Sequence, residues 1–175
     1  MDESTTAATL WKSNHDKQRP VWPAAGFIVT VVDDPATHGD LWVLPTDGGQ
    51  PHQLIATEFD EEDPAVSPDG QWIAFVSDRS GANEIYVRRM SVGRVLQIST
   101  KGGTSPAWNH DGSEIFYVGA DRMLMSVAVR PTASSLDAAA AKPLFALPRI
   151  AGRRPFSVTS DDRFLLSAST PAGTN

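Results

Sequence analysis

Residues 63–87 read DPAVSPDGQWIAFVSDRSGANEIYV. A brief apolar pair at 65–66 is followed by a turn at 69–70 and a long apolar run at 72–76. A polar loop at 78–83 then leads to a second apolar run at 85–87. Asp-Gly turns join antiparallel strands, because Gly reaches positive φ without strain and Asp accepts hydrogen bonds from nearby amides. Short β-branched and aromatic runs bounded by Gly, Pro and Asp indicate strands buried on both faces. The stretch therefore predicts three consecutive antiparallel strands.

The turn recurs along the chain. Its last residue falls at Gly26, Gly70, Gly112 and Asp162, which are 44, 42 and 50 residues apart. A proline stands six positions before the first three of these residues and seven before the fourth. Asp in place of Gly is a mild departure, because Asp tolerates the left-handed region. A repeat of about 43 residues is the size of one propeller blade.

Each repeat predicts four strands. The apolar runs that follow the turns lie at 27–32, 72–76, 115–118 and 164–166. The next strands are predicted at 41–44, 85–87 and 124–127, and the outer strands at 53–55, 96–98 and 144–146. A brief strand before the turn is predicted at 65–66 and at 107–108. In the Ala-rich insertion at 131–142 we expect a helical turn over 135–141.

The predicted fold is all-β: a β-propeller of four-stranded antiparallel blades, with three full blades plus a half blade. We expect residues 1–19 to form a flexible N-terminal tail, in which Leu10 and Trp11 could pair as a strand. The propeller repeats then occupy residues 20–175, with blades at about 20–58, 59–101, 102–150 and 151–175.

A half blade leaves an unpaired strand edge and an uncovered apolar face. Three explanations stay open: residues 1–19 add a strand to the last blade, two copies combine into a larger ring, or the chain is a fragment. Because blades bury their apolar faces only against neighbours, we expect that the purified chain is not a well-packed monomer.

Composition narrows the function classes. The 15 Lys and Arg against 21 Asp and Glu leave a net charge of −6, which argues against nucleic-acid binding. The absence of Cys excludes disulfides, thiolate zinc sites and cysteine nucleophiles. No apolar run is long enough for membrane insertion, and the start of the chain lacks the pattern of a signal peptide.

Four residue groups invite chemical hypotheses. The acidic run 58–63 suggests calcium, but it lacks EF-hand spacing, so a solvated loop between blades is favoured. The histidines lack ligand-like pairing and are expected to be exposed; they are His15, His38, His52 and His110. Four tryptophans are interpreted as packing residues between blades: Trp22, Trp42, Trp72 and Trp108. Three arginines form a basic cluster expected to serve loop solubility, namely Arg79, Arg88 and Arg89.

No Gly-x-Ser-x-Gly nucleophile elbow occurs in the sequence. The run at 67–72 also lacks the Ser-x-Asp-x-Gly-x-x-Trp spacing of a sialidase-type Asp-box, because Asp69 and Gly70 are adjacent. We therefore expect no catalytic residue, no cofactor site and no metal site, and no enzyme activity within this chain.

Residues 63–81, continuing to 84–87, resemble the repeat of the TolB-like, WD-type β-propeller family. The Ser-Pro-Asp-Gly turn, the Ser-Asp-Arg-Ser-Gly loop and Glu-Ile-Tyr-Val occur together in that family. Residues 106–117 look like the next blade. Residues 156–165 look like the final blade of bacterial signalling proteins, in which the propeller follows a Ser/Thr kinase or winged-helix domain. The resemblance covers residues 20–169.

The resemblance implies a non-catalytic protein-interaction or sensor module of a larger bacterial signalling or envelope protein. It implies protein partners and a periplasmic location, since TolB is a periplasmic partner of the Tol–Pal envelope system. Either a homo-oligomer or missing blades would complete the ring. The alternative is the gating propeller of a prolyl-oligopeptidase-type serine peptidase whose hydrolase domain lies elsewhere, because such peptidases carry similar blades.

Overall fold

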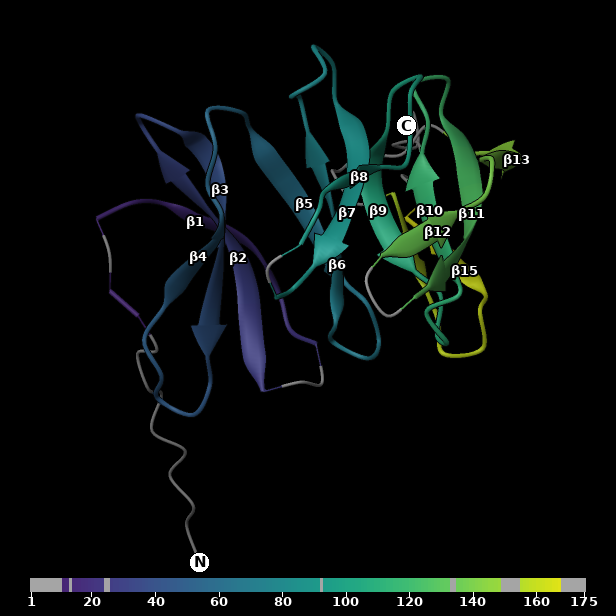
Figure 1. The fold of residues 1–175 in the computed structure, drawn as a ribbon. Coiled ribbons are helices and arrows are strands. Elements are labelled where there is room, and N and C mark those ends of the chain that lie inside the picture. Colours follow the sequence, from purple (N-terminus) through teal and green to yellow (C-terminus); the bar gives the residue numbers. More distant parts are fainter. Residues whose placement is uncertain are drawn as a thin grey trace, which may run out of the picture.

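In the computed structural model, residues 11–12, 14–23, 26–91, 93–132, 135–148 and 155–167 are described. They form antiparallel sheets that stand side by side in sequence order (Figure 1). The described residues form no helix, so none of them belongs to a helix that could cross a membrane. The predicted all-β, partial propeller fold is confirmed.

Each sheet is built from strands that follow one another in the chain. The first sheet contains β1 (Lys17–Val21), β2 (Phe27–Asp34), β3 (His38–Pro45) and β4 (His52–Ile55). The second contains β5 (Glu61–Val66), β6 (Trp72–Ser77), β7 (Glu84–Arg89) and β8 (Leu96–Gln97). The third contains β9 (Thr104–Trp108), β10 (Glu114–Val118), β11 (Met123–Pro131), β12 (Leu136–Ala138) and β13 (Lys142–Ala146). Among the described residues, the fourth contains β14 (Phe156–Val158) and β15 (Phe164–Leu166).

We expected residues 1–19 to form a flexible tail, but the first strand begins within them. β1 begins at Lys17 and pairs with β2, so residues 17–19 belong to the first sheet and do not complete the last one. Trp11 lies outside any strand, and its ring stacks on Trp42 with centroids 4.9 Å apart. Leu10 lies outside the described residues.

The helical turn predicted over residues 135–141 is wrong. Residues 136–138 form β12, which pairs with β11 in the register Val129 to Ala138. The nine-residue β11 offers a long edge, and Leu136 becomes buried on the core between the second and third sheets. Pairing and burial therefore override the helix propensity of the alanines.

The four turn residues share one backbone conformation. Their φ values are 74° at Gly26, 71° at Gly70, 76° at Gly112 and 57° at Asp162. Positive φ at all four positions explains why Gly or Asp recurs there, as the repeat predicted.

The core lies between neighbouring sheets. One cluster joins the first sheet to the second, and another joins the second to the third. A smaller cluster joins the third sheet to β14, through the buried side chains of Phe116, Leu124, Leu147 and Phe156. Each sheet is thus stabilised by the next one, as expected of stacked repeats.

Candidate binding site on the inner strands

β1, β5 and β9 each carry an irregularity in front of the repeated proline. The residues that precede these prolines have positive φ: 53° at Arg19, 47° at Asp63 and 53° at Ser105. In each strand the register with its neighbour shifts around this point. A residue before proline normally adopts an extended conformation, so this is a departure that marks a β-bulge. Bulges redirect side chains, and here they do so at equivalent positions of successive sheets.

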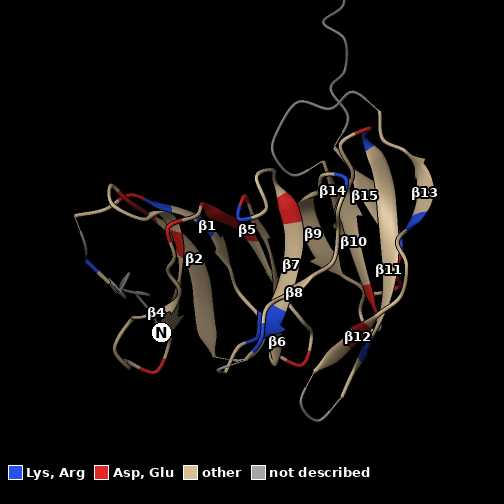
Figure 2. Ribbon diagram, turned by 45° about the horizontal axis from the view of Figure 1, so that its top comes forward, with Lys and Arg blue, Asp and Glu red and all other residues tan. Residues whose placement is uncertain are grey.

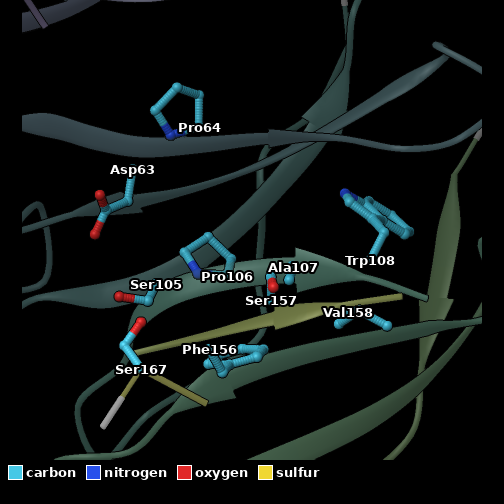
Figure 3. Close-up of a pocket in the computed structure, with 10 residues that line it drawn as sticks. All are labelled: Asp63, Pro64, Ser105, Pro106, Ala107, Trp108, Phe156, Ser157, Val158 and Ser167. Atoms are coloured by element: carbon cyan, nitrogen blue, oxygen red, sulfur yellow. The ribbon is translucent and has the colours of Figure 1, made fainter. Parts of the chain in front are cut away.

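A cavity of about 350 Å³ lies where β5, β9 and β14 meet (Figure 3). We call it the inner-strand pocket; it is lined by Asp63, Pro64, Ser105, Pro106, Ala107, Trp108, Phe156, Ser157, Val158 and Ser167. Two of its lining residues, Asp63 and Ser105, are the bulged residues of consecutive sheets. The bulge that recurs in each of these repeats therefore supplies part of the pocket lining.

The pocket has a polar end and an apolar end. Figure 3 shows Asp63, Ser105 and Ser167 at one end and Trp108 and Val158 at the other. The indole Nε1 of Trp108 donates a hydrogen bond to the backbone oxygen of Ala65 (2.9 Å), which fixes the ring. One carboxylate and three serine hydroxyls beside six apolar residues suit a ligand with both polar and apolar groups, such as a peptide segment.

An ion pair stands beside the polar end. Arg19 Nη1 lies 2.5 Å from Asp63 Oδ1 and 3.2 Å from Glu62 Oε2, and so joins the first sheet to the second. The side chains of Arg19 and Asp63 are 12% and 11% exposed. Burial raises the pKa of Glu62; the charge of Arg19 opposes this effect, and those of Asp60 and Asp63 add to it.

The acidic run 58–63 is only partly the solvated loop that was expected. Glu61 begins β5 and is fully buried, where its Oε1 accepts hydrogen bonds from Thr57, Ser77 and Arg79. Burial raises the pKa of the Glu61 carboxyl, although these three donors lower it. In the described part of the chain, no group of three or more His, Asp or Glu residues is arranged to hold a metal ion.

The four histidines lie in separate places. His38 and His52 begin β3 and β4, and His110 occupies the turn between β9 and β10; all three are exposed. His15 Nδ1 lies 3.5 Å from Asp34 Oδ2. The structure therefore brings no two of them together at the inner-strand pocket.

The packing role predicted for the tryptophans holds for two of them. Trp72 and Trp108 are buried in the cluster between the second and third sheets. Trp42 is half-buried against Trp11 rather than between sheets. For Trp22 the prediction is wrong, because it follows the end of β1 and its side chain is 70% exposed.

The arginines predicted to form one cluster are separated. Arg79 lies in the loop before β7, pairs with the buried Glu61 (3.1 Å) and lies over the ring of Tyr86 (5.1 Å). Arg88 and Arg89 end β7, and Figure 2 shows Lys or Arg at one end of this strand and Asp or Glu at the other. Arg88 donates to the backbone oxygen of Leu54 in the first sheet (3.1 Å). Arg79 and Arg88 thus join a loop and two sheets to their neighbours, in addition to any role in solubility.

Neither the ion pair of Arg19 with Asp63 nor the inner-strand pocket was predicted from the sequence. A signal was present, because the prolines at 20, 64 and 106 stand at one position of the repeat. Residues 19, 63 and 105 are therefore equivalent, and a basic residue in one repeat stands beside an acidic residue in the next.

Comparison with known proteins gives a family and a fold. Residues 4–140 match the family described as the TolB beta propeller domain. The chain is 34% identical over 86 residues to "Protein TolB homolog" of Chlorobium chlorochromatii, and 32% identical over 76 residues to "Tricorn protease homolog 1" of Streptomyces coelicolor. These alignments cover 49% and 42% of this chain, but only 20% and 7% of those proteins.

Among solved structures, TolB from Acinetobacter baumannii superposes with a TM-score of 0.67. The superposition covers 95% of this chain and 41% of that chain, at 18% sequence identity. This likeness shows a shared fold. The chain spans less than half of each of these three proteins.

Proposed function

Because the chain belongs to the TolB beta propeller domain family, we propose that it is a non-catalytic propeller module that binds another protein. The inner-strand pocket carries this proposal. Three separate sheets contribute to it, so a bound segment would contact the second, third and fourth repeats together. Its polar end can take the backbone or a polar group of a peptide, and its apolar end a side chain.

In this proposal, the partner is a protein of a bacterial signalling or envelope pathway. A TolB homolog is among the proteins similar to this chain, which supports the envelope side of it. The chain would act as the sensor or docking part of a larger protein.

A second candidate is the gating propeller of a serine peptidase of the prolyl-oligopeptidase type. The similarity to "Tricorn protease homolog 1" favours it, since that protein is named as a protease. Here the propeller would control access to a hydrolase domain encoded elsewhere. A nucleophile elbow in the flanking reading frame would support this candidate over the first.

The first candidate is tested by obstructing the pocket. Ser157 is exposed on β14 and lines the pocket, so Ser157→Trp fills it without removing a core side chain. Immobilised wild-type chain and the variant are exposed to extracts of the source bacterium, and bound proteins are quantified by mass spectrometry. We expect one protein to be retained by the wild type and to fall at least fivefold with the variant.

The matched control is Ser80→Trp, in the exposed loop before β7 and away from the pocket. It should retain the partner as the wild type does. Equal capture by Ser157→Trp and the wild type would show that the pocket is not the binding site. Peptide hydrolysis by the protein encoded by the whole reading frame, lost when the nucleophile of its elbow is replaced, would favour the second candidate.

A further inference from the structure

Three Asp-Gly pairs occur in the sequence, at 47–48, 69–70 and 111–112, and each lies in a connection between two strands. They share one local contact. The Oδ1 atom of the aspartate accepts a hydrogen bond from the backbone N–H two residues later, which belongs to Gly49 (3.0 Å), Gln71 (3.0 Å) and Ser113 (2.9 Å). This contact holds each carboxyl group beside the backbone of the glycine that follows the aspartate.

An aspartate held in this way can react with its own backbone. The glycine nitrogen attacks Cγ of the aspartate, a C–N bond forms, and the carboxyl hydroxyl leaves with the amide proton as water. The product is a succinimide ring. Water then opens the ring, and cleavage between the glycine nitrogen and the former backbone carbonyl leaves isoaspartate, in which the chain continues through Cγ. Glycine favours the attack, because no side chain shields its nitrogen and its backbone adopts many conformations.

In two of the three pairs, the attacking nitrogen is held by a turn. The Gly70 N–H donates a hydrogen bond to the backbone oxygen of Ser67 (2.9 Å), and the Gly112 N–H donates one to that of Asn109 (3.3 Å). Each bond closes a β-turn and directs the N–H toward the turn carbonyl. The nitrogen can approach Cγ only after the turn has opened locally, so these bonds slow ring closure.

The carboxyl groups of the same two pairs are held as well. Asp69 Oδ1 accepts a second hydrogen bond from Ser67 Oγ (2.6 Å), and Asp111 Oδ1 accepts one from Asn109 Nδ2 (2.8 Å). The hydrogen bonds from Ser113 and Asn109 lower the pKa of the Asp111 carboxyl. A carboxylate loses its oxygen less readily than the protonated acid, so a lowered pKa also slows ring closure.

The pair at 47–48 lacks this protection. Among the described residues, none accepts a hydrogen bond from the Gly48 N–H, and Gly49 is the one donor to the Asp47 carboxylate. Gly48 has a φ of 90°, and a Cβ placed there would have no atom within 4 Å. Both residues of the pair are exposed to water. The backbone can therefore rotate toward the Asp47 carboxyl without breaking a contact.

We propose that Asp47 is a modification site, which converts to isoaspartate through a succinimide with Gly48 while the protein stays folded. Asp69 and Asp111 remain ordinary aspartates. The change adds one methylene to the backbone between β3 and β4 and frees the α-carboxylate of residue 47. The fold tolerates it, since residues 46–51 belong to none of the core clusters.

The freed α-carboxylate sets the class of enzyme that would act on this site. A carboxyl methyltransferase specific for isoaspartate transfers the methyl group of S-adenosylmethionine from sulfur to this carboxylate, which forms a methyl ester. The nitrogen of Gly48 then displaces methanol from the ester and forms the succinimide again. The modified loop is therefore a substrate for a repair reaction of this kind.

The test uses the whole 175-residue chain, kept at neutral pH and physiological temperature, with its fold monitored by circular dichroism. Cleavage after Glu58 and Glu84 separates the three pairs, and electron-transfer fragmentation of the peptides locates isoaspartate. We expect at least ten times more isoaspartate at residue 47 than at residue 69 or residue 111. In guanidinium the unfolded chain has no turns, so all three pairs should react at similar rates.

A variant and its control address the chemistry. Asp47→Glu keeps the carboxylate but needs a six-membered ring, so methyl transfer by the isoaspartate methyltransferase to the aged protein should fall at least fivefold. Asp69→Glu, the matched control, should accept methyl groups as the wild type does. The proposal is overturned if residue 47 stays aspartate in the folded chain while the unfolded chain reacts. It is also overturned if all three pairs react equally in the folded chain, or if methyl transfer to Asp47→Glu is unchanged.

Discussion

Single residues in the turns hold successive repeats together. Asp162 adopts the same left-handed conformation as the three glycines, and it adds a contact that Gly cannot make. Its Oδ1 accepts a hydrogen bond from the backbone N of His110, 2.9 Å away in the turn of the previous repeat. A Cβ at Gly112 would lie 3.6 Å from Cδ of Pro68, in the turn before that. The turns of the second, third and fourth repeats therefore lie next to one another.

Gly112→Ala should lower the free energy of unfolding by about 1 kcal/mol. The contact with Pro68 is an ordinary one, so the cost comes from placing Cβ in the left-handed region. Chemical denaturation at neutral pH measures it. Gly112→Asn is the control and should cost less, because Asn enters this region more readily. Equal stability of Gly112→Ala and the wild type would contradict the role of the turn.

Asp40→Asn should make the protein more stable at pH 7. Asp40 is 1% exposed; its Oδ1 has no hydrogen-bond partner among the described residues, while Oδ2 accepts a hydrogen bond from Thr37 (2.8 Å). Burial, aided by the charge of Asp34, raises the pKa of Asp40 above its ordinary value of 3.8, although the bond from Thr37 lowers it. The charged carboxylate therefore opposes folding at pH 7, and the variant removes a penalty of about 1 kcal/mol.

The sign of the effect sets its pH dependence. Above the raised pKa of Asp40 the penalty is fully present, and below 3.8 the carboxyl is protonated in both the folded and the unfolded chain. The advantage of Asp40→Asn should therefore shrink as the pH falls through this window. Urea denaturation of both proteins at pH 7 and pH 4 measures the difference. A variant less stable than the wild type at pH 7 would refute this prediction.

At the scale of strands, the inner strand of each repeat does two things. In β1, β5 and β9 it pairs with its neighbour and also carries a bulge before proline. Arg19 of β1 thereby reaches Asp63 of β5, whose φ is also positive. The contact between the first and second sheets thus has a polar part in addition to its apolar cluster.

Arg19→Met should destabilise the protein by about 3 kcal/mol, because it leaves the nearly buried Asp63 without its cation. The double variant Arg19→Met with Asp63→Asn should recover part of this loss. Thermal and urea denaturation measure both. Arg130→Met is the matched control: its pair with Asp137 is 83% and 58% exposed, so little change is expected. Equal effects of the two single variants would contradict a special role for the Arg19 pair.

The strands were predictable where local chemistry determines them. Apolar runs such as 72–76 and Asp-Gly turns are properties of a few adjacent residues, and the strands β6 and β10 lie where expected. β12 was not predictable, because the alanines at 138–141 favour a helix and only pairing with the long edge of β11 makes residues 136–138 extended. The inner-strand pocket was not predictable either, since it depends on how three sheets approach one another.

At the scale of the whole molecule, the sheets form an open series. Each of the first two junctions has a large apolar cluster, whereas the third has a smaller one. The exposed apolar residues include four close to this last junction: Leu144, Phe145, Leu165 and Leu166. Within the described residues, burial is therefore least complete at the fourth sheet.

Size-exclusion chromatography with light scattering should show self-association of the purified chain. Exposed apolar side chains at the fourth sheet drive it, because monomeric proteins rarely leave such patches uncovered. Leu165→Lys with Phe145→Lys should reduce the self-association. A single monomeric peak with one sharp, cooperative melting transition would contradict the prediction. Loss of β-structure in the circular dichroism spectrum of the variant would show that it is unfolded.

Within the described residues, every sheet is made of strands that are consecutive in the chain, and no strand crosses from one sheet into another. A gene of this kind can therefore gain or lose a unit by duplication or deletion without rewiring the hydrogen bonds of the others. The number of blades in a ring then depends on how many copies of the repeat unit the gene encodes. Diversification can act on each copy separately, with one inner bulge changing from basic to acidic while the scaffold around it is inherited unchanged.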